Sequence, residues 1–198
     1  QGEAAGGDGG ASVFVAENAA KRVLVPTGAV DEAWRTDPDF DDAAWIEGTG
    51  GVGYERSTGY EQYFDINLQS QMYGAHSSCY IRIPFEISEE TLNALSNLSL
   101  KVRYDDGFIA YLNGSEVARM NFNGEPASDS AAVAQNSDLN AIDLEPFDVT
   151  AGIGQLHPGR NLLAIHALNV DTTSSDFLMS AMLSIGQRVV AGGGAVSP

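Results

Sequence analysis

The stretch LSLKVRYDDGFIAYLNGSEVAR, residues 98–119, decides the fold class of this sequence. Its first seven residues alternate apolar and polar side chains, the pattern of a strand with one buried face. Asn113-Gly114 then separates two strand-like runs, and this dipeptide is the strongest short hairpin signal because both central turn residues need positive φ. We therefore expect a three-stranded antiparallel meander over residues 98–119, with Asp105-Asp106-Gly107 as its first turn.

Further strands are indicated on both sides of this stretch. In residues 80–85 the odd-numbered side chains share an apolar face, and Pro84 indicates an edge strand or a strand end. Residues 162–168 are apolar on both faces except for His166, which is typical of a central strand. One side of a last strand is lined by Phe177, Met179, Ala181, Leu183 and Ile185. Only residues 88–95 look helical, so the pattern predicts an all-β antiparallel sandwich of the jelly-roll type.

Composition limits the partners and the domain count. The formal charge of −17, from 10 basic and 27 acidic residues, argues against binding to nucleic acid or to an anionic membrane surface. No run approaches the ~20 apolar residues that span a bilayer, so we expect no membrane insertion. The single Cys79 excludes an internal disulfide and a multi-cysteine metal site. We expect one domain over residues 13–187, between Gly-rich linkers at residues 1–12 and 188–198, taken from a larger parent protein.

Several motifs follow one another in a recognisable order: FDDAAW at 40–45, YIRIPF at 80–85, DDGFIAYLNGSEVAR at 105–119 and GRNLLAI at 159–165. With them the chain resembles galactose-binding-like jelly-roll modules of large secreted bacterial proteins, from marine bacteria and planctomycetes especially. It is also similar to the sugar-binding domain of family 2 glycoside hydrolases. The resemblance implies a jelly roll and an extracellular location, without fixing a ligand. Within these motifs we expect the aromatic side chains to enter the core and the aspartates to form turns.

The sequence favours binding over catalysis. It has no His-Glu-x-x-His motif, phosphate loop or Gly-x-Ser-x-Gly elbow, and His76, His157 and His166 are scattered. With 27 acidic residues, a pair at glycosidase spacing arises by chance. We expect a non-catalytic, extracellular carbohydrate-binding module whose partners are a polysaccharide or glycan and neighbouring domains of the parent chain. The alternative is a structural spacer or a protein-interaction (adhesion) module without a glycan ligand.

The glycan site is expected in residues 50–79, where the strand pattern stops although aromatic residues are frequent. The tyrosines offer ring faces and hydroxyls, and the other polar side chains can bind sugar hydroxyls or carboxylates. The predicted ligand-binding residues are Tyr54, Arg56, Tyr60, Gln62, Tyr63, Tyr73 and His76. In the alternative interpretation, Tyr54 and Phe64 fold back to plug the end of the sandwich. The second candidate site is the loop at residues 121–140.

A structural calcium ion is a separate hypothesis. Aspartates gather before and within the FDDAAW motif, and loops rich in Asp supply the oxygen ligands that Ca²⁺ prefers. The predicted metal ligands are Asp37, Asp39, Asp41 and Asp176, with Asp42 adjoining them. The spacing departs from an EF-hand, since the Gly at the sixth position and the Glu at the twelfth are missing. A solvated acidic turn is the alternative interpretation.

Overall fold

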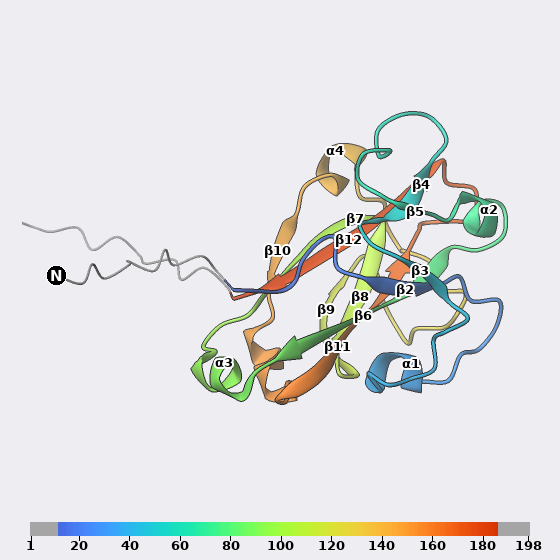
Figure 1. Cartoon of the computed structure of the whole chain (residues 1–198). Coiled ribbons are helices and arrows are strands. Elements are labelled where there is room, and N and C mark those ends of the chain that lie inside the picture. Colours follow the sequence, from blue (N-terminus) through green and yellow to red (C-terminus); the bar gives the residue numbers. More distant parts are fainter. Residues whose placement is uncertain (1–11, 186–198) are drawn as a thin grey trace, which may run out of the picture.

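The computed structural model describes residues 12–185, over which the chain forms a sandwich of two six-stranded sheets (Figure 1). The first sheet runs in the order β10 (Glu145–Asp148), β7 (Ser99–Asp105), β12 (Asp176–Ser184), β4 (Val52–Glu55) and β5 (Ile66–Asn67), with β1 (Val13–Val15) also paired to β12. The second runs β3 (Ile46–Gly48), β2 (Lys21–Leu24), β6 (Ser78–Ile87), β11 (Gly159–Leu168), β8 (Gly107–Leu112) and β9 (Ser115–Met120). All pairs are antiparallel except β4–β5. The predicted all-β sandwich is confirmed, while the predicted linkers lie outside the described residues except for Ser12.

The predicted meander is correct at its second turn and wrong at its first. β8 and β9 form the expected hairpin, with Asn113 at φ 46° and Gly114 at φ 91°. However, β7 belongs to the first sheet and β8 to the second, so Asp105-Asp106-Gly107 carries the chain across the sandwich. The alternation in β7 does specify its buried face, but its partners β10 and β12 lie far away in sequence. Local patterning therefore could not identify the strands beside β7.

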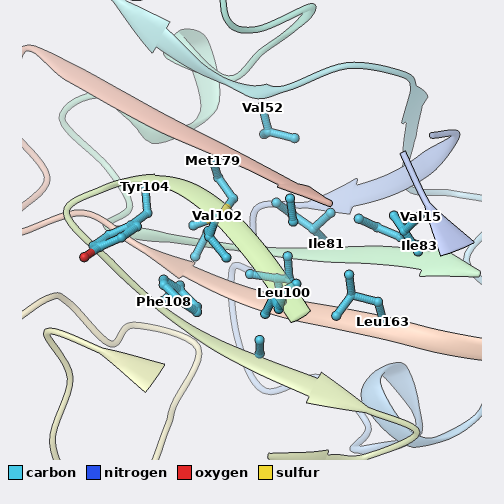
Figure 2. Close-up of a cluster of buried hydrophobic side chains, with 14 of the residues drawn as sticks. Val15, Val52, Ile81, Ile83, Leu100, Val102, Tyr104, Phe108, Leu163 and Met179 are labelled. Atoms are coloured by element: carbon cyan, nitrogen blue, oxygen red, sulfur yellow. The ribbon is translucent and has the colours of Figure 1, made fainter. Parts of the chain in front are cut away.

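The main core fills the space between the two sheets. Figure 2 shows Leu100 and Val102 of β7 in the cluster with Ile81 and Ile83 of β6, while Tyr104 lies farther along β7 beside Phe108. Alternate residues of β11 and β12 join the same cluster, as their sequence periods predict. Cys79, a free thiol, is also buried there.

In the second sheet the structure corrects one expectation and confirms another. β6 is an interior strand between β2 and β11, so the edge interpretation of Pro84 is wrong. β2 pairs only with residues 80–82 of β6, and Pro84 therefore lies where that neighbour has ended. β11 is a central strand as expected, with β6 on one side and β8 on the other.

A second apolar cluster covers the outer face of the second sheet. Trp34, in the single-turn helix α1 (Ala33–Thr36), stacks on Tyr80 with ring centroids 4.2 Å apart. Trp45 is buried in the same cluster and meets Phe40 edge-on at 6.0 Å. The aromatic residues of FDDAAW therefore pack into the structure as expected.

Arg82 holds this covering segment to the sheet. Its guanidinium group is buried and donates hydrogen bonds to the Asp42 carboxylate, at 2.6 Å, and to the carbonyl oxygens of Trp34, Asp37 and Pro38. The central arginine of YIRIPF and the second aspartate of FDDAAW are thus direct partners. Both motifs stabilise the fold.

Helices are short throughout the described residues. The predicted one is α3 (Glu89–Ala94), where Ser88 Oγ accepts a hydrogen bond from the Thr91 N–H as an N-cap. The single turns α2 (Gln69–Met72) and α4 (Asp138–Ala141) were not predicted. Within residues 12–185 no helix has the length and apolar character to span a bilayer.

Candidate functional site

Five connections meet at one end of the sandwich, here called the loop end. The strand register brings them together, because Glu55 at the end of β4 lies opposite Asp176 at the start of β12. Leu168 at the end of β11 lies opposite both Ser78 and Gly107, the first residues of β6 and β8. In Figure 1 the connection from β4 to β5 and helix α4 appear together at the top of this end. Loops held by a rigid sandwich in this way commonly carry binding sites.

A hollow of about 250 Å³ opens at the loop end. We call it the acidic pocket, since its lining is polar and includes Asp105, Asp106, Asn136, Asp138, Ser174 and Asp176. None of the described residues that line it is basic. Four carboxylates therefore face a shared space from three different segments of the chain.

The carboxylate of Asp106 is used by the fold. Its Oδ1 accepts a hydrogen bond from the Asn136 N–H at 2.9 Å, and its Oδ2 accepts one from the Val170 N–H at 2.8 Å. These two bonds join the loop after β9 to the loop after β11. Both oxygens of this buried carboxylate are therefore satisfied by backbone donors.

Asp105 is in a different situation. Its side chain is only 3% exposed, and its Oδ2 is buried without a hydrogen-bond partner. Burial, followed by the neighbouring Asp106 carboxylate and then by Asp176 and Asp138, raises the pKa of Asp105 to about 9. The Tyr60 hydroxyl, buried beside this carboxyl, is the protein donor available to it, and burial together with the Asp105 charge raises the pKa of Tyr60. Tyr60 and Asp105 thus form a buried polar pair next to the acidic pocket.

Residues 50–79 are more regular than the sequence indicated. They contain β4, β5 and α2, so the expectation of a long connection without regular structure is wrong. The glycines of this segment made β4 difficult to recognise from the sequence. A Cβ at Gly53 would lie 2.3 Å from the carbonyl oxygen of Phe177 on β12, so only glycine fits at this position without a clash. Tyr54 is fully buried against Phe177 and donates a hydrogen bond to the Ser174 carbonyl, so it fills the interior as the plug interpretation proposed. Tyr60 is buried as well, and neither ring presents a face to solvent.

The remaining predicted ligand-binding residues lie at different places on the surface and do not form one site. The exposed Arg56 guanidinium lies 3.8 Å from the ring centroid of Tyr73, which is 36% exposed. Gln62 is exposed, and Tyr63 is half-buried with the Arg103 guanidinium above its ring. His76 lies in a different hollow of about 340 Å³, also lined by Trp45 and Gln71.

Two backbone hydrogen bonds connect the segments that carry Arg56 and Tyr73 to the β11–β12 loop. The Arg56 N–H donates to the Ser175 carbonyl at 3.0 Å, and the Gly74 N–H, next to Tyr73, donates to the Thr172 carbonyl at 2.6 Å. Ser174, in the same β11–β12 loop, lines the pocket. The exposed pair and the acidic pocket therefore flank one loop.

The four predicted metal ligands are not brought together. Asp37 and Asp41 each accept a hydrogen bond from the backbone N–H two residues ahead, as in aspartate turns, and Asp39 pairs with Arg160 at 2.6 Å. These three lie beside the second sheet, whereas Asp176 begins β12 in the first sheet. Between residues 12 and 185, no cluster of three or more His, Cys, Asp or Glu side chains is arranged to hold a metal by itself.

Sequence reasoning missed most of the acidic pocket. The sequence indicates Asp105 and Asp106 only as turn residues, and Asn136 carries no signal of its own. One feature of the sequence could have indicated the pocket: two consecutive aspartates lie between two buried strands, although a single aspartate is enough to form a turn. The second candidate loop, residues 121–140, does contribute Asn136 and Asp138 to the pocket.

Comparisons with known proteins extend the fold assignment. No protein-family model and no curated protein matches the sequence. Among solved structures, a β-glucuronidase from an uncultured Clostridium species superposes with a TM-score of 0.50 at 13% identity, covering 90% of this chain and 30% of that one. β-Glucuronidases of Ruminococcus gnavus (TM-score 0.48, 10% identity, 90% and 29% covered) and Bifidobacterium dentium (0.47, 15%, 82% and 21%) are also similar. The chain therefore spans less than a third of these enzymes, and the likeness to the first shows a shared sandwich fold.

Proposed function

We propose that this chain is a non-catalytic carbohydrate-binding module of a larger extracellular protein and that it binds its glycan at the loop end. The observation that carries the proposal is the exposed Arg56–Tyr73 pair beside the acidic pocket. Saccharide sites combine an aromatic surface with a few fixed polar groups. Here Tyr73 offers the ring, Arg56 offers donors for a hydroxyl or a carboxylate, and the pocket offers acceptors.

Two further features support binding without catalysis. The solved β-glucuronidases with a similar sandwich are several times longer than this chain, which leaves most of each enzyme without a counterpart here. Of the histidines, His166 is buried under α1, where burial and the Arg35 charge lower its pKa to about 3. A neutral, enclosed imidazole cannot reach a ligand at the loop end.

The test is a glycan array followed by titration of the strongest hit against wild type, Tyr73→Ala and Arg56→Ala. Loss of the Tyr73 ring should weaken binding by about 1–2 kcal/mol, roughly 5- to 30-fold in Kd. Arg160→Ala is the matched control, because this arginine is exposed and pairs with Asp39 on the other sheet. A wild type that binds no glycan, or binding unchanged in both loop-end variants, would contradict the proposal and favour the spacer or adhesion function.

A further inference from the structure

Two hollows adjoin along β3, and neither shares a lining residue with the acidic pocket. The first is the hollow of about 340 Å³ that His76 lines, and the second, of about 480 Å³, opens between β3 and β5, the edge strands of the two sheets. Ile46 of β3 and Gln71 of α2 line both hollows, which therefore form one elongated depression, here called the edge groove. Figure 1 shows α2, β5 and β3 on the same side of the sandwich.

The strand pairing leaves the edge groove open along its length. β3 pairs only with β2, and β5 pairs only with β4, so neither edge strand covers the other. The two edges come close at one point, where a Cβ on Gly48 would lie 2.6 Å from Cγ1 of Ile66. An elongated depression between two sheet edges fits a linear chain better than a compact ligand.

The lining of the edge groove combines an apolar floor with polar groups at the rim. Val23 and Trp45 are buried and Ile46 is half-buried, whereas Gln71 is exposed and His76 is half-buried. The second hollow adds further hydroxyl and amide side chains. A sugar ring has an apolar face and an edge of hydroxyl groups, so this combination suits sugars.

Charge narrows the class of ligand. Of the described residues that line the edge groove, none is lysine or arginine, while Glu47 and Asp65 are both exposed. Because the whole chain carries a formal charge of −17, a polysaccharide with uronate or sulfate groups would be repelled. An extended peptide is disfavoured as well, since β3 offers only three residues for strand addition, fewer than the five to six of a usual strand.

Helix α2 connects the edge groove to the Arg56–Tyr73 pair. Gln71 lines the groove, and Tyr73, two residues later, is exposed beneath the Arg56 guanidinium. The His76 N–H then donates to the Met72 carbonyl at 2.8 Å, and this turn brings the chain back to the groove. The Cα atoms of Tyr73 and His76 are at most about 11 Å apart, because only three residues separate them. One oligosaccharide can therefore contact both places.

We propose that the edge groove binds a linear, neutral polysaccharide and that the same sugar chain reaches the Arg56–Tyr73 pair. Sugar rings lie on the apolar floor around Ile46, and Gln71 and His76 form hydrogen bonds with sugar hydroxyls. This assignment rests on the proposed glycan binding and adds the class of the ligand and the length of its site.

The experiment is a calorimetric titration with oligosaccharides of increasing length. Fragments of two to six sugars, cut from the neutral polysaccharide that the chain binds best on the array, are compared with oligogalacturonates of equal length. We expect Kd to fall at least tenfold from the disaccharide to the hexasaccharide, because only the longer fragments fill the groove. The oligogalacturonates should bind at least tenfold more weakly than the neutral fragments.

Variants locate the sugar chain. Gln71→Ala and His76→Ala should each weaken hexasaccharide binding at least fivefold without lowering the melting temperature, since neither side chain is buried. His157→Ala is the matched control, because this histidine is exposed at the start of β11, opposite the loop end, and the variant should bind like the wild type.

Four outcomes would overturn the proposal. Equal affinities for the disaccharide and the hexasaccharide, with loss of binding only in Tyr73→Ala, would remove the edge groove and leave the proposed function intact. Tighter binding of oligogalacturonates would contradict the neutral class. A dimer in sedimentation that His76→Ala dissociates, with no effect on sugar binding, would assign the groove to a second copy of the chain. A wild type that binds no glycan would refute the groove assignment and the proposed function together.

Discussion

Replacing Arg82 by alanine should destabilise this protein more than replacing any exposed arginine. The guanidinium is 1% exposed on β6 and makes four hydrogen bonds. One bond goes to the carboxylate of Asp42, and the other three go to backbone carbonyl oxygens of the segment that includes α1. This one side chain therefore attaches the aromatic cover of the second sheet to its central strands.

The expected loss of stability can be estimated from the Asp42 carboxylate, which the substitution leaves without its buried partner. Removing one partner of a buried ion pair costs about 3–5 kcal/mol, because the other charge stays uncompensated. Asp42 is 22% exposed and keeps a 3.8 Å contact with Arg22, so the lower end of this range, about 3 kcal/mol, is expected. For a domain of this size that corresponds to a fall of about 6–12 °C in melting temperature.

Urea denaturation and thermal melts of Arg82→Ala, Arg82→Lys and Arg160→Ala measure this effect. Lysine should recover little stability, because an ammonium group cannot reproduce the planar set of guanidinium donors. Arg160 pairs with Asp39 at 49% and 72% exposure, so its loss should cost less than about 1 kcal/mol. Equal stabilities of Arg82→Ala and Arg160→Ala would refute the reasoning that Arg82 holds the cover in place.

Two further predictions concern pH and the hairpin turn. Burial lowers the pKa of His166 to about 3 in the folded protein, whereas the pKa is about 6.5 in the unfolded chain, so protonation of this histidine favours unfolding. As the pH falls below 6.5, the free energy of unfolding of the wild type should therefore decrease by up to about 1.4 kcal/mol per pH unit relative to that of His166→Leu. Urea titrations of the two proteins at several pH values measure this difference. A pH profile that is parallel in the two proteins would show that His166 is not buried in its neutral form. Gly114→Ala should cost at least about 1–2 kcal/mol, because φ is +91° and the new Cβ would lie 2.5 Å from Thr36 Cγ2. Gly154→Ala, with open space around it, is the control, and equal melting temperatures for the two would contradict the turn assignment.

The sequence predicted the strands well where one face is buried. The period of two in β7, β6 and β12 follows from packing against a single core, so Leu100, Ile81 and Met179 could be assigned to the interior in advance. The hairpin at Asn113-Gly114 could also be predicted from the sequence, since the signal for a turn is local. The pairing of β7 with β10 and β12 was not, because pairing depends on which distant strands complete the sheet.

The candidate glycan site was predictable only in part. A tyrosine in a Gly-rich segment looks the same in sequence whether it fills the interior, as Tyr54 does, or lies at the surface, as Tyr73 does. The difference arises from β4, whose glycines allow close contact with β12 and thereby turn Tyr54 inward. Likewise, a run of aspartates resembles a metal site in the sequence, and only the structure shows which hydrogen-bond donor each carboxylate contacts. In Asp37 and Asp41 that partner is a nearby backbone N–H.

Asp105-Asp106-Gly107, the crossing between the two sheets, shows how one short motif meets several requirements of the fold. Gly107 is required by packing, since a Cβ there would lie 2.8 Å from the Met120 carbonyl oxygen. Asp106 is required by two loops whose backbone N–H groups it accepts. Asp105 is buried beside the Tyr60 hydroxyl, for which its carboxyl is the available acceptor. Each residue of this crossing therefore has a packing or hydrogen-bonding role in the fold.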